Sequence, residues 1–285
     1  MQVSVIIPTC LRSEHELIRS IDSALWNGFS DIEIIIVNDN RELKICDFIM
    51  LINRYQGKPV KFHDNTGARG AASARNFGVS FAEGEIITFL DDDDFILAGR
   101  IAQMHTAFVQ YEPEGVVMVS TGRIYQYNDY SKLEVVKRQV FGKVYLKDIY
   151  LHNDIDIGFM VRKSLFLDLG GFDQSYANLE DWDFIIRALM NGSAFKIKSL
   201  SYVVKNDALH NRVSNNDYLG LEKIAEVYKF KFGSEWYYKI KTQQKISQNK
   251  FSLIDLIVHT FKTKDMYPAR LLAGYYFRKL INNHD

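Results

Sequence analysis

The sequence lacks several features that would each have pointed to a common class of protein. It contains only two cysteines, Cys10 and Cys46, without the spacing of a metal site, so a reducing cytoplasm is the simplest expectation. No apolar run approaches the roughly 18 residues that are needed to cross a bilayer. The opening Met-Gln-Val-Ser-Val-Ile-Ile-Pro has no charged region ahead of a long apolar stretch, so we expect a strand there and not a signal peptide.

Motifs for binding phosphate or zinc are also missing. Neither G-x-G-x-x-G after the first strand nor G-x-x-x-x-G-K-[ST] occurs, so any nucleotide has to be held by carboxylates, a metal and side chains. His15-Glu16 begins like H-E-x-x-H, but Arg19 stands at the second histidine position and excludes a zincin. Lys plus Arg and Asp plus Glu both number 35, and this balance gives no support to a nucleic-acid partner.

The zero net charge hides a basic C-terminal part. Residues 218–285 contain 12 Lys or Arg against 6 Asp or Glu, together with 13 aromatic residues. Basic and aromatic residues at one end of a chain favour contact with an anionic membrane surface. A helical cap with a solvated basic face explains the same composition, and composition alone does not decide between the two.

Strands and helices alternate through the first third of the chain. Apolar runs predict strands at 3–7, 32–37, 60–62 and 86–90, and helices are predicted after Ser13, across 43–54 and over 71–82. Such alternation is typical of an α/β fold with a Rossmann-like, mostly parallel central sheet flanked by helices. Further on, we expect a helix at 98–111, strands at 116–120, 122–127 and 159–162, a helix at 180–190, and helices from about 218, with breaks near Gly233 and Pro268.

Four consecutive carboxylates, Asp91 to Asp94, follow the strand that ends at Leu90. Adjacent Asp side chains repel one another unless a cation or several hydrogen-bond donors hold them. This pattern favours a site for a hard divalent metal, whose open positions would bind phosphate oxygens. The alternative is a solvated acidic turn in which Asp94 caps the next helix.

Polar residues also follow two other predicted strands, with Pro8-Thr9 after the first and Asn38-Asp39 after the second. Ligands of parallel sheets bind beyond the carboxyl ends of the strands, so we expect these residues to meet the acidic turn. Asp39 could accept hydrogen bonds from a base or ribose, although Asn-Asp-Asn alone is a good turn. Arg75 could reach a phosphate or a uracil, but its spacing alone favours a surface position on an amphipathic helix.

A second acidic cluster, Glu180-Asp181-Trp182-Asp183, stands at the start of a predicted helix. The helix dipole is enough to explain one acid there. Three acids around a tryptophan suggest instead a general base beside a platform for a sugar.

Together, these segments resemble the family 2 glycosyltransferases of the A-type fold, over residues 1 to about 215. The matching segments, in order, are 5–9, 35–39, 74–78, 82–87, 89–93, 170–173 and 180–182. The resemblance implies an inverting transfer of a sugar from a nucleotide sugar, usually a UDP-sugar, to an acceptor hydroxyl. Two positions depart from the family pattern: Cys10-Leu11 replaces the usual Tyr-Asn, and Asn38-Asp39 replaces the commoner Asp-Asp.

The resemblance also implies a role for each matching residue. Asp181 would be the catalytic base, and Glu180 and Trp182 would lie on the acceptor side. Asp93, completed by His210, would bind Mn²⁺ or Mg²⁺. The donor would be bound by Pro8, Thr9, Arg12, Asp39, Arg75, Asn76, Asp91 and Asp92.

These expectations divide the chain into a catalytic domain at 1–217 and a basic, aromatic helical extension at 218–285. The nucleotide-sugar half would cover about 1–97 and the acceptor half about 98–217. The acceptor is expected to be a lipid-linked or growing bacterial surface glycan, reached by a cytoplasmic enzyme that is peripheral to the membrane. Two rivals remain: a sugar-nucleotide pyrophosphorylase, which would need a glycine-rich first loop with a basic residue, and a non-catalytic carbohydrate-binding protein.

Overall fold

The first part of the sheet is parallel, as the alternation of elements predicts. The computed structural model describes residues 1–127, 131–136, 139–206 and 217–282. The strands lie in the order β3-β2-β1-β4, and their neighbours pair in parallel. Their bounds are β1 (Val3–Thr9), β2 (Ile32–Asn38), β3 (Val60–Asp64) and β4 (Ile86–Phe89).

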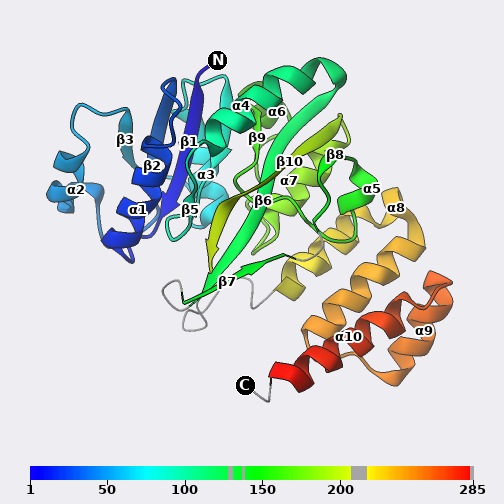
Figure 1. Ribbon diagram of the computed structural model, residues 1–285. Helices are drawn as coiled ribbons and strands as arrows, with labels where there is room; N and C mark the ends of the chain where they lie inside the picture. The colour runs from blue at the N-terminus through cyan, green and yellow to red at the C-terminus, as the bar shows by residue number, and fades with distance from the viewer. Residues whose placement is uncertain (128–130, 137–138, 207–216, 283–285) are drawn as a thin grey trace. The chain divides into compact units, whose positions relative to one another are not determined.

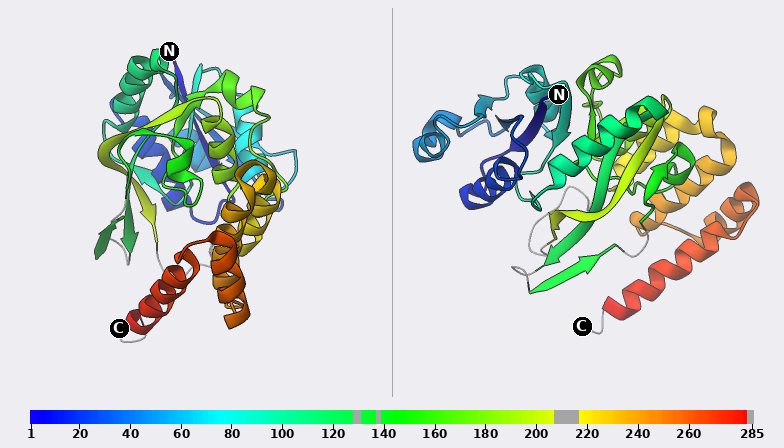
Figure 2. Two further views of the ribbon diagram at one scale, coloured as in Figure 1. Left: turned by 90° about the vertical axis from the view of Figure 1, so that its right-hand side faces the viewer. Right: turned by 45° about the horizontal axis from the view of Figure 1, so that its top comes forward.

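The sheet continues beyond β4 with mixed pairing, in the order β9-β6-β10-β5. β6 pairs in parallel with β10, whereas β9, β5, β7 and β8 pair antiparallel with their neighbours. The bounds are β5 (Phe95–Ile96), β6 (Val116–Tyr127), β7 (Lys132–Val135), β8 (Gly142–Val144), β9 (Met160–Arg162) and β10 (Ser193–Lys205). The two strands expected within 116–127 are one strand, and β10 was not expected. In Figure 1 and in the right view of Figure 2, β7 lies along the end of β6.

Helices cover both faces of the sheet, because neighbouring residues of a strand point to opposite sides. On one face, Val5 and Ile34 belong to an apolar core that includes residues of α1, α2 and α4. On the other, Ile6 lies under α3, and a group of aromatic rings joins β4 to α6 and α7. The helical segments here are α1 (Glu14–Leu25), η1 (Ile45–Asp47), α2 (Ile49–Arg54), α3 (Ala71–Ser80), α4 (Arg100–Tyr111), η2 (Glu112–Glu114), α5 (Leu146–Ile149), α6 (Lys163–Asp168) and α7 (Glu180–Leu189).

The chain forms two compact units. The first contains Met1–Gln174 and Phe184–His210, and the second contains Ser175–Asp183 and Asn211–Asp285. The second unit thus takes nine residues from the middle of the chain, including the start of α7, in addition to the expected C-terminal extension.

The C-terminal part of the second unit is helical, with α8 (Asp217–Ser247), α9 (Leu253–Thr263) and α10 (Tyr267–Asn282). The expected break at Gly233 is a kink within α8, where φ is 81°. Pro268 is the second residue of α10, where a missing N–H breaks no helical bond. Across the described part of the chain, no helix combines the length and apolar character that crossing a bilayer requires.

Candidate functional site

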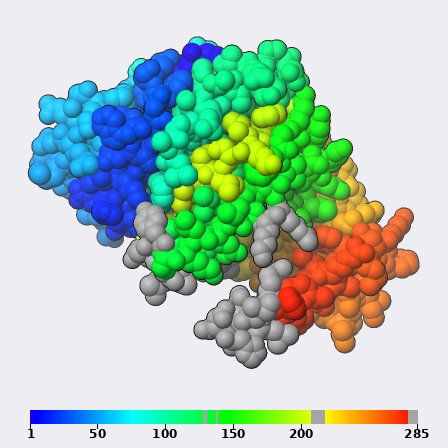
Figure 3. Space-filling model, viewed as in Figure 1, coloured from blue at the N-terminus to red at the C-terminus, as the bar shows by residue number. Residues whose placement is uncertain are grey.

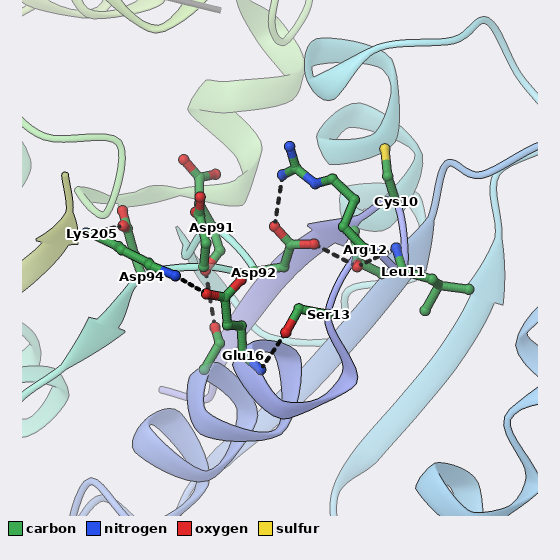
Figure 4. A network of polar contacts seen from close by, with 12 residues as sticks. Cys10, Leu11, Arg12, Ser13, Glu16, Asp91, Asp92, Asp94 and Lys205 are labelled. Carbon is green, nitrogen blue, oxygen red and sulfur yellow. Dashed lines mark hydrogen bonds and ion pairs between the residues drawn. The ribbon is translucent and has the colours of Figure 1, made fainter. Parts of the chain in front are cut away.

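The acidic turn, Asp91–Asp94, follows β4 and is tied directly to the end of β1. Thr9 Oγ1 donates a 2.6 Å hydrogen bond to Asp92 Oδ2, and Arg12 Nη2 lies 3.3 Å from Asp92 Oδ1. Burial raises the pKa of Asp92, and the bonds from Thr9 and Arg12 partly offset this rise. The structure therefore brings together the predicted donor-site residues Thr9, Arg12 and Asp92. Figure 4 shows Arg12 and Asp92 near the start of α1.

The loop after β1 takes its shape from Thr9 as well. Thr9 Oγ1 accepts a 2.9 Å bond from the Leu11 N–H, and Leu11 has a φ of 55°, which is unusual for a leucine. Asn40 Nδ2 donates to the Cys10 carbonyl at 2.9 Å and so joins this loop to the end of β2. The segment that departs from the family pattern is therefore held in place by hydrogen bonds from its own neighbourhood.

Arg75 is buried at the site and is not the surface residue that its spacing alone favoured. Its Nη2 lies 2.6 Å from Asp91 Oδ1, and its guanidinium lies 5.8 Å from the centre of the Phe172 ring. The Asp91 carbonyl accepts a 3.0 Å bond from Ser20 of α1. Arg75 thus fixes the first carboxylate of the acidic turn, while the Asp91 side chain keeps about a third of its surface exposed.

The side-chain amide of Asn76 forms two hydrogen bonds with the backbone of Phe172. Its Nδ2 donates to the Phe172 carbonyl at 2.8 Å, and its Oδ1 accepts the Phe172 N–H at 2.9 Å. Both bonds fasten α3 to the Gly171-Phe172 turn. These bonds give Asn76 a structural role, and its role in donor binding stays a prediction.

Asp39 is 4% exposed and lies where β2 ends. Its Oδ1 accepts from Asn65 Nδ2 at 2.7 Å, and its Oδ2 accepts from the Gly70 N–H at 2.7 Å. Arg41 lies 3.7 Å from Oδ1. A carboxylate offers about four acceptor positions, so these contacts orient Asp39 and leave capacity for a ligand.

Asp93 and Asp94 lie in a buried environment, close to other carboxylates of the acidic turn. Burial, strengthened by Asp91 and Asp92, raises the pKa of Asp93 to about 6. Burial also raises the pKa of Asp94 well above its usual range, although Asp94 Oδ1 accepts the Lys205 N–H at 2.9 Å. Negative charge on Asp93 and Asp94 is thus disfavoured, and a cation beside them would favour it.

The donor set suits a hard divalent cation only in part. Its oxygens are carboxylates, which Mg²⁺ and Mn²⁺ prefer, and Mg²⁺ is commonly held by one or two carboxylates together with substrate phosphates. Among the residues that the structure describes, no three His, Cys, Asp or Glu side chains are grouped to hold a metal by themselves. His210, the second predicted ligand, lies outside the described residues. The turn therefore fits an ion that a substrate helps to coordinate.

The second acidic cluster begins α7. Leu179 has a φ of 63°, and the helix starts directly after it with Glu180 and Asp181. Asp181 Oδ1 accepts the Trp182 N–H at 2.8 Å. The Trp182 side chain is 3% exposed, and the roles of Glu180, Asp181 and Trp182 stay predictions.

Asp183 fastens this helix start to the rest of the second unit. Its Oδ1 accepts from Tyr176 Oη at 3.2 Å and from Tyr228 Oη of α8 at 2.7 Å. Asn178 Oδ1 accepts the Gly220 N–H of α8 at 2.9 Å. Polar bonds to α8 thus hold the segment on both sides of Asp181.

Several residues of the site were not predicted. Arg19 Nη2 donates to the Asp93 carbonyl at 2.5 Å, and Lys205 forms an ion pair with Glu16 beside Asp94. Arg19 is the residue that replaces the second histidine of an H-E-x-x-H motif. Its position in the sequence did not predict the contact with Asp93. These bonds join residues 74 to 189 positions apart, so no local pattern reveals them.

Comparison with known proteins shows which family the sequence matches. Residues 4–170 match the model of the family described as Glycosyl transferase family 2. An uncharacterized glycosyltransferase of Methanocaldococcus jannaschii is 26% identical over 250 residues, which is 85% of this chain and 79% of that protein. One of Haemophilus influenzae is 26% identical over 200 residues, 67% of this chain and 63% of that protein.

A characterised relative matches over a shorter range. The Escherichia coli enzyme named UDP-Glc:alpha-D-GlcNAc-diphosphoundecaprenol beta-1,3-glucosyltransferase WfgD is 32% identical over 103 residues, 35% of this chain and 38% of that protein. The chain thus spans less than two thirds of the Haemophilus and Escherichia relatives.

Solved structures share the fold. Residues 1–349 of S. aureus TarS superpose with a TM-score of 0.66 at 20% identity, covering 89% of this chain and 75% of that one. The same TarS fragment in complex with UDP-GlcNAc gives a TM-score of 0.65 at 18% identity, covering 98% and 92%. With its parallel N-terminal sheet, the acidic turn beyond β4 and a family match over more than half its length, this chain belongs to glycosyl transferase family 2.

Proposed function

We propose that this chain is an inverting glycosyltransferase that moves a sugar from a UDP-sugar to an acceptor hydroxyl. The observation that carries the proposal is the acidic turn, built at the strand ends of a family 2 chain and braced by Thr9, Arg12 and Arg75. The UDP-GlcNAc complex of TarS supports a UDP-sugar donor. The E. coli relative and a Campylobacter jejuni relative are both named as glucosyltransferases with an undecaprenol-linked acceptor, which supports an acceptor on a lipid-linked bacterial glycan.

The donor would lie across the strand ends. Asp39, whose orientation is fixed by Asn65 and Gly70, would accept hydrogen bonds from the base or ribose. Thr9 and Arg12 would line the nucleotide through the loop after β1, and Asp91 would stand near the ribose. Arg75 would keep Asp91 in place, because it is already bonded to that carboxylate.

Asp93 would hold a divalent cation, Mn²⁺ or Mg²⁺, with His210 as a further ligand. When bound, such an ion supplies positive charge against the departing diphosphate, whose accumulating negative charge otherwise slows the reaction. A bound cation would also favour the ionised form of Asp93, whose pKa is raised to about 6 by burial and by the neighbouring carboxylates.

Asp181 would act as the general base. It would take the proton of the acceptor hydroxyl as that oxygen attacks the anomeric carbon from the face opposite the leaving group, which inverts the configuration. Base catalysis of this kind contributes about 10²–10⁴-fold. Glu180 and Trp182 would lie beside the acceptor, and the basic residues of 218–285 would bring the enzyme to an anionic membrane on the cytoplasmic side.

The base assignment is tested with Asp181→Asn, an isosteric change that removes the proton acceptor. We expect UDP affinity, measured by calorimetry, to stay unchanged while sugar transfer falls by about 10²–10⁴-fold. Asp168→Asn, at an exposed acid of α6, is the matched control and should keep full activity. Transfer by Asp181→Asn at the wild-type rate would refute the assignment.

The donor is identified by a thermal-shift screen of nucleotide sugars with and without Mn²⁺, because a ligand that binds the folded state raises its melting temperature. Incubation with a sugar phosphate and a nucleoside triphosphate separates the proposal from a pyrophosphorylase, which would form a nucleotide sugar. A chain that neither hydrolyses nor transfers any bound UDP-sugar would instead be a carbohydrate-binding protein.

A further inference from the structure

α9 turns its apolar side outward and its polar side inward. Its exposed side chains include five large apolar ones, between 41% and 78% exposed, whereas His259 and Thr263 are buried. A surface helix normally does the opposite. The five residues, which we call the apolar α9 face, are Leu253, Ile254, Ile257, Val258 and Phe261.

Polar contacts within the second unit fix this orientation. His259 Nδ1 lies 2.7 Å from Thr242 Oγ1 of α8, and Asp255 forms an ion pair with Lys245 of α8. Thr263 Oγ1 donates to the Asp265 carbonyl at 3.3 Å. Because the contacts of His259 and Asp255 join α9 to α8, the helix cannot turn to bury its apolar side without breaking them.

The apolar α9 face is continuous along the helix. Leu253, Ile257 and Phe261 are spaced four residues apart, so they form one stripe, and Ile254 and Val258 widen it on one side. Residues of α9 and α10, coloured orange to red, form part of the surface in Figure 3. Contiguous exposed apolar surface of this kind marks a contact with a partner or a membrane.

The charges around the face are positive. Lys250 precedes the helix, and Lys262 and Lys264 stand at its other end, all exposed. The two nearby acids, Asp255 and Asp265, are engaged by Lys245 and Lys239. Lipid surfaces with anionic headgroups match this combination of apolar stripe and cationic flanks. A second copy of the chain would bring the same cations against them and would be repelled.

We propose that the apolar α9 face inserts into the headgroup region of an anionic lipid surface, with Lys250, Lys262 and Lys264 contacting the lipid phosphates. This refines the membrane association proposed above to one helix and its residues. It does not depend on sugar transfer, because lipid binding is measured without donor or acceptor.

The experiment is flotation of the full chain with phosphatidylcholine vesicles that contain phosphatidylglycerol. We expect the wild type to float with them, more weakly as salt rises, and not with phosphatidylcholine alone. The variant Leu253→Ser/Ile257→Ser/Phe261→Ser should bind at least about tenfold more weakly, because three side chains that would enter the lipid are lost. Phe230→Ser, at the 90% exposed phenylalanine of α8, is the matched control and should bind as the wild type does.

Because all three changed positions are exposed, the triple variant should keep the melting temperature and UDP affinity of the wild type, which separates this test from that of the transferase. Unchanged flotation of the triple variant would overturn the proposal. So would sedimentation equilibrium that shows a dimeric wild type and a monomeric variant, since the face would then join two copies. Equal binding to vesicles with and without phosphatidylglycerol would overturn the part assigned to the lysines.

Discussion

At the scale of single residues, the proposed metal ligand Asp93 is a carboxylate whose ionisation is opposed by its surroundings. Its pKa is raised because burial and two neighbouring carboxylates oppose its ionisation, and a bound cation would remove that cost. For Asp93→Ala we expect metal-dependent UDP affinity to fall by about 10–100-fold, as changes around a metal site commonly cause. Calorimetry with and without Mn²⁺ measures this, with Asp168→Ala as control. Identical metal-dependent affinity would remove Asp93 from the metal site.

Glu33 is a second buried carboxylate, far from any proposed chemistry. Burial alone would raise its pKa, but hydrogen bonds from Lys61, Ser4 and the Glu83 and Gly84 amides outweigh burial and lower its pKa. Glu33→Gln loses the charge and turns an amide toward donors, so we expect about 1–3 kcal/mol lower unfolding free energy at pH 7.

The pH dependence of this loss follows from the lowered pKa. Ionised Glu33 stabilises the fold fully above its unfolded pKa, near the ordinary value of 4.5, and this contribution disappears as pH falls through the lower folded pKa. Urea denaturation from pH 7 down to about pH 3 should therefore show a constant difference between the two proteins above the unfolded pKa and a shrinking difference below it. Exposed Glu42→Gln should match the wild type throughout. A constant difference at all pH values would mean that charge is not the cause.

The residues of the site could be predicted from the sequence where the signal is local. Four consecutive acids after an apolar strand predict a site directly, and Thr9 and Asp39 were predicted from their positions at the ends of strands. Arg75 could not be placed by its spacing, because its burial depends on Asp91, 16 residues away. Lys205 and Arg19 reach the acidic turn from still more distant positions, and no pattern within a window of sequence carries such contacts.

At the scale of secondary structure, β1, β2 and β4 were predicted because their apolar runs are nearly continuous, as buried parallel strands require, whereas the partly buried β3 was expected only over 60–62. β10 was not predicted, since its register against β6 shifts between Ile197 and Leu200 and again before Tyr202. Each shift breaks the alternation of inward and outward side chains on which recognition of a strand depends. Lys196 and Ser201, which are buried within β10, obscure the pattern further.

The packing of α3 on the sheet depends on one glycine. A Cβ atom at Gly78 would lie 2.5 Å from Ile6 Cγ2 and 2.9 Å from Val37 Cγ2, so a larger residue pushes α3 away from β1 and β2. We expect Gly78→Ala to lower the unfolding free energy by about 1–3 kcal/mol, despite the better helix propensity of alanine. Thermal denaturation measures this, with exposed Ser80→Ala as control. Ile6→Ala removes the clashing Cγ2, so Gly78→Ala should cost less in an Ile6→Ala background, and an equal cost in both backgrounds would argue against a steric cause.

At the scale of the whole molecule, the division into two units makes the proposed base depend on the C-terminal helices. Asp183 and Asn178 flank Asp181, and their partners Tyr228 and Gly220 belong to α8. The residues proposed for the donor lie in the first unit. For residues 1–217 alone we expect UDP binding to persist and transfer to fall about 100-fold, because the base loses its fixed position.

Calorimetry and a transfer assay measure the two properties of this truncation. The full chain with Tyr228→Phe, which loses only a hydroxyl, should show the same effect in weaker form without changing UDP affinity. Full transfer activity in the truncated chain would show that Asp181 does not need α8.

The second unit draws residues from two separate stretches of the chain, Ser175–Asp183 and Asn211–Asp285. Recombination between relatives at a single crossover after residue 210 would therefore pair one parent's nine-residue insert with another parent's helices. Functional chimaeras should arise only when both stretches come from the same parent. Acceptor specificity should then be transferred between relatives by exchanging the two stretches together.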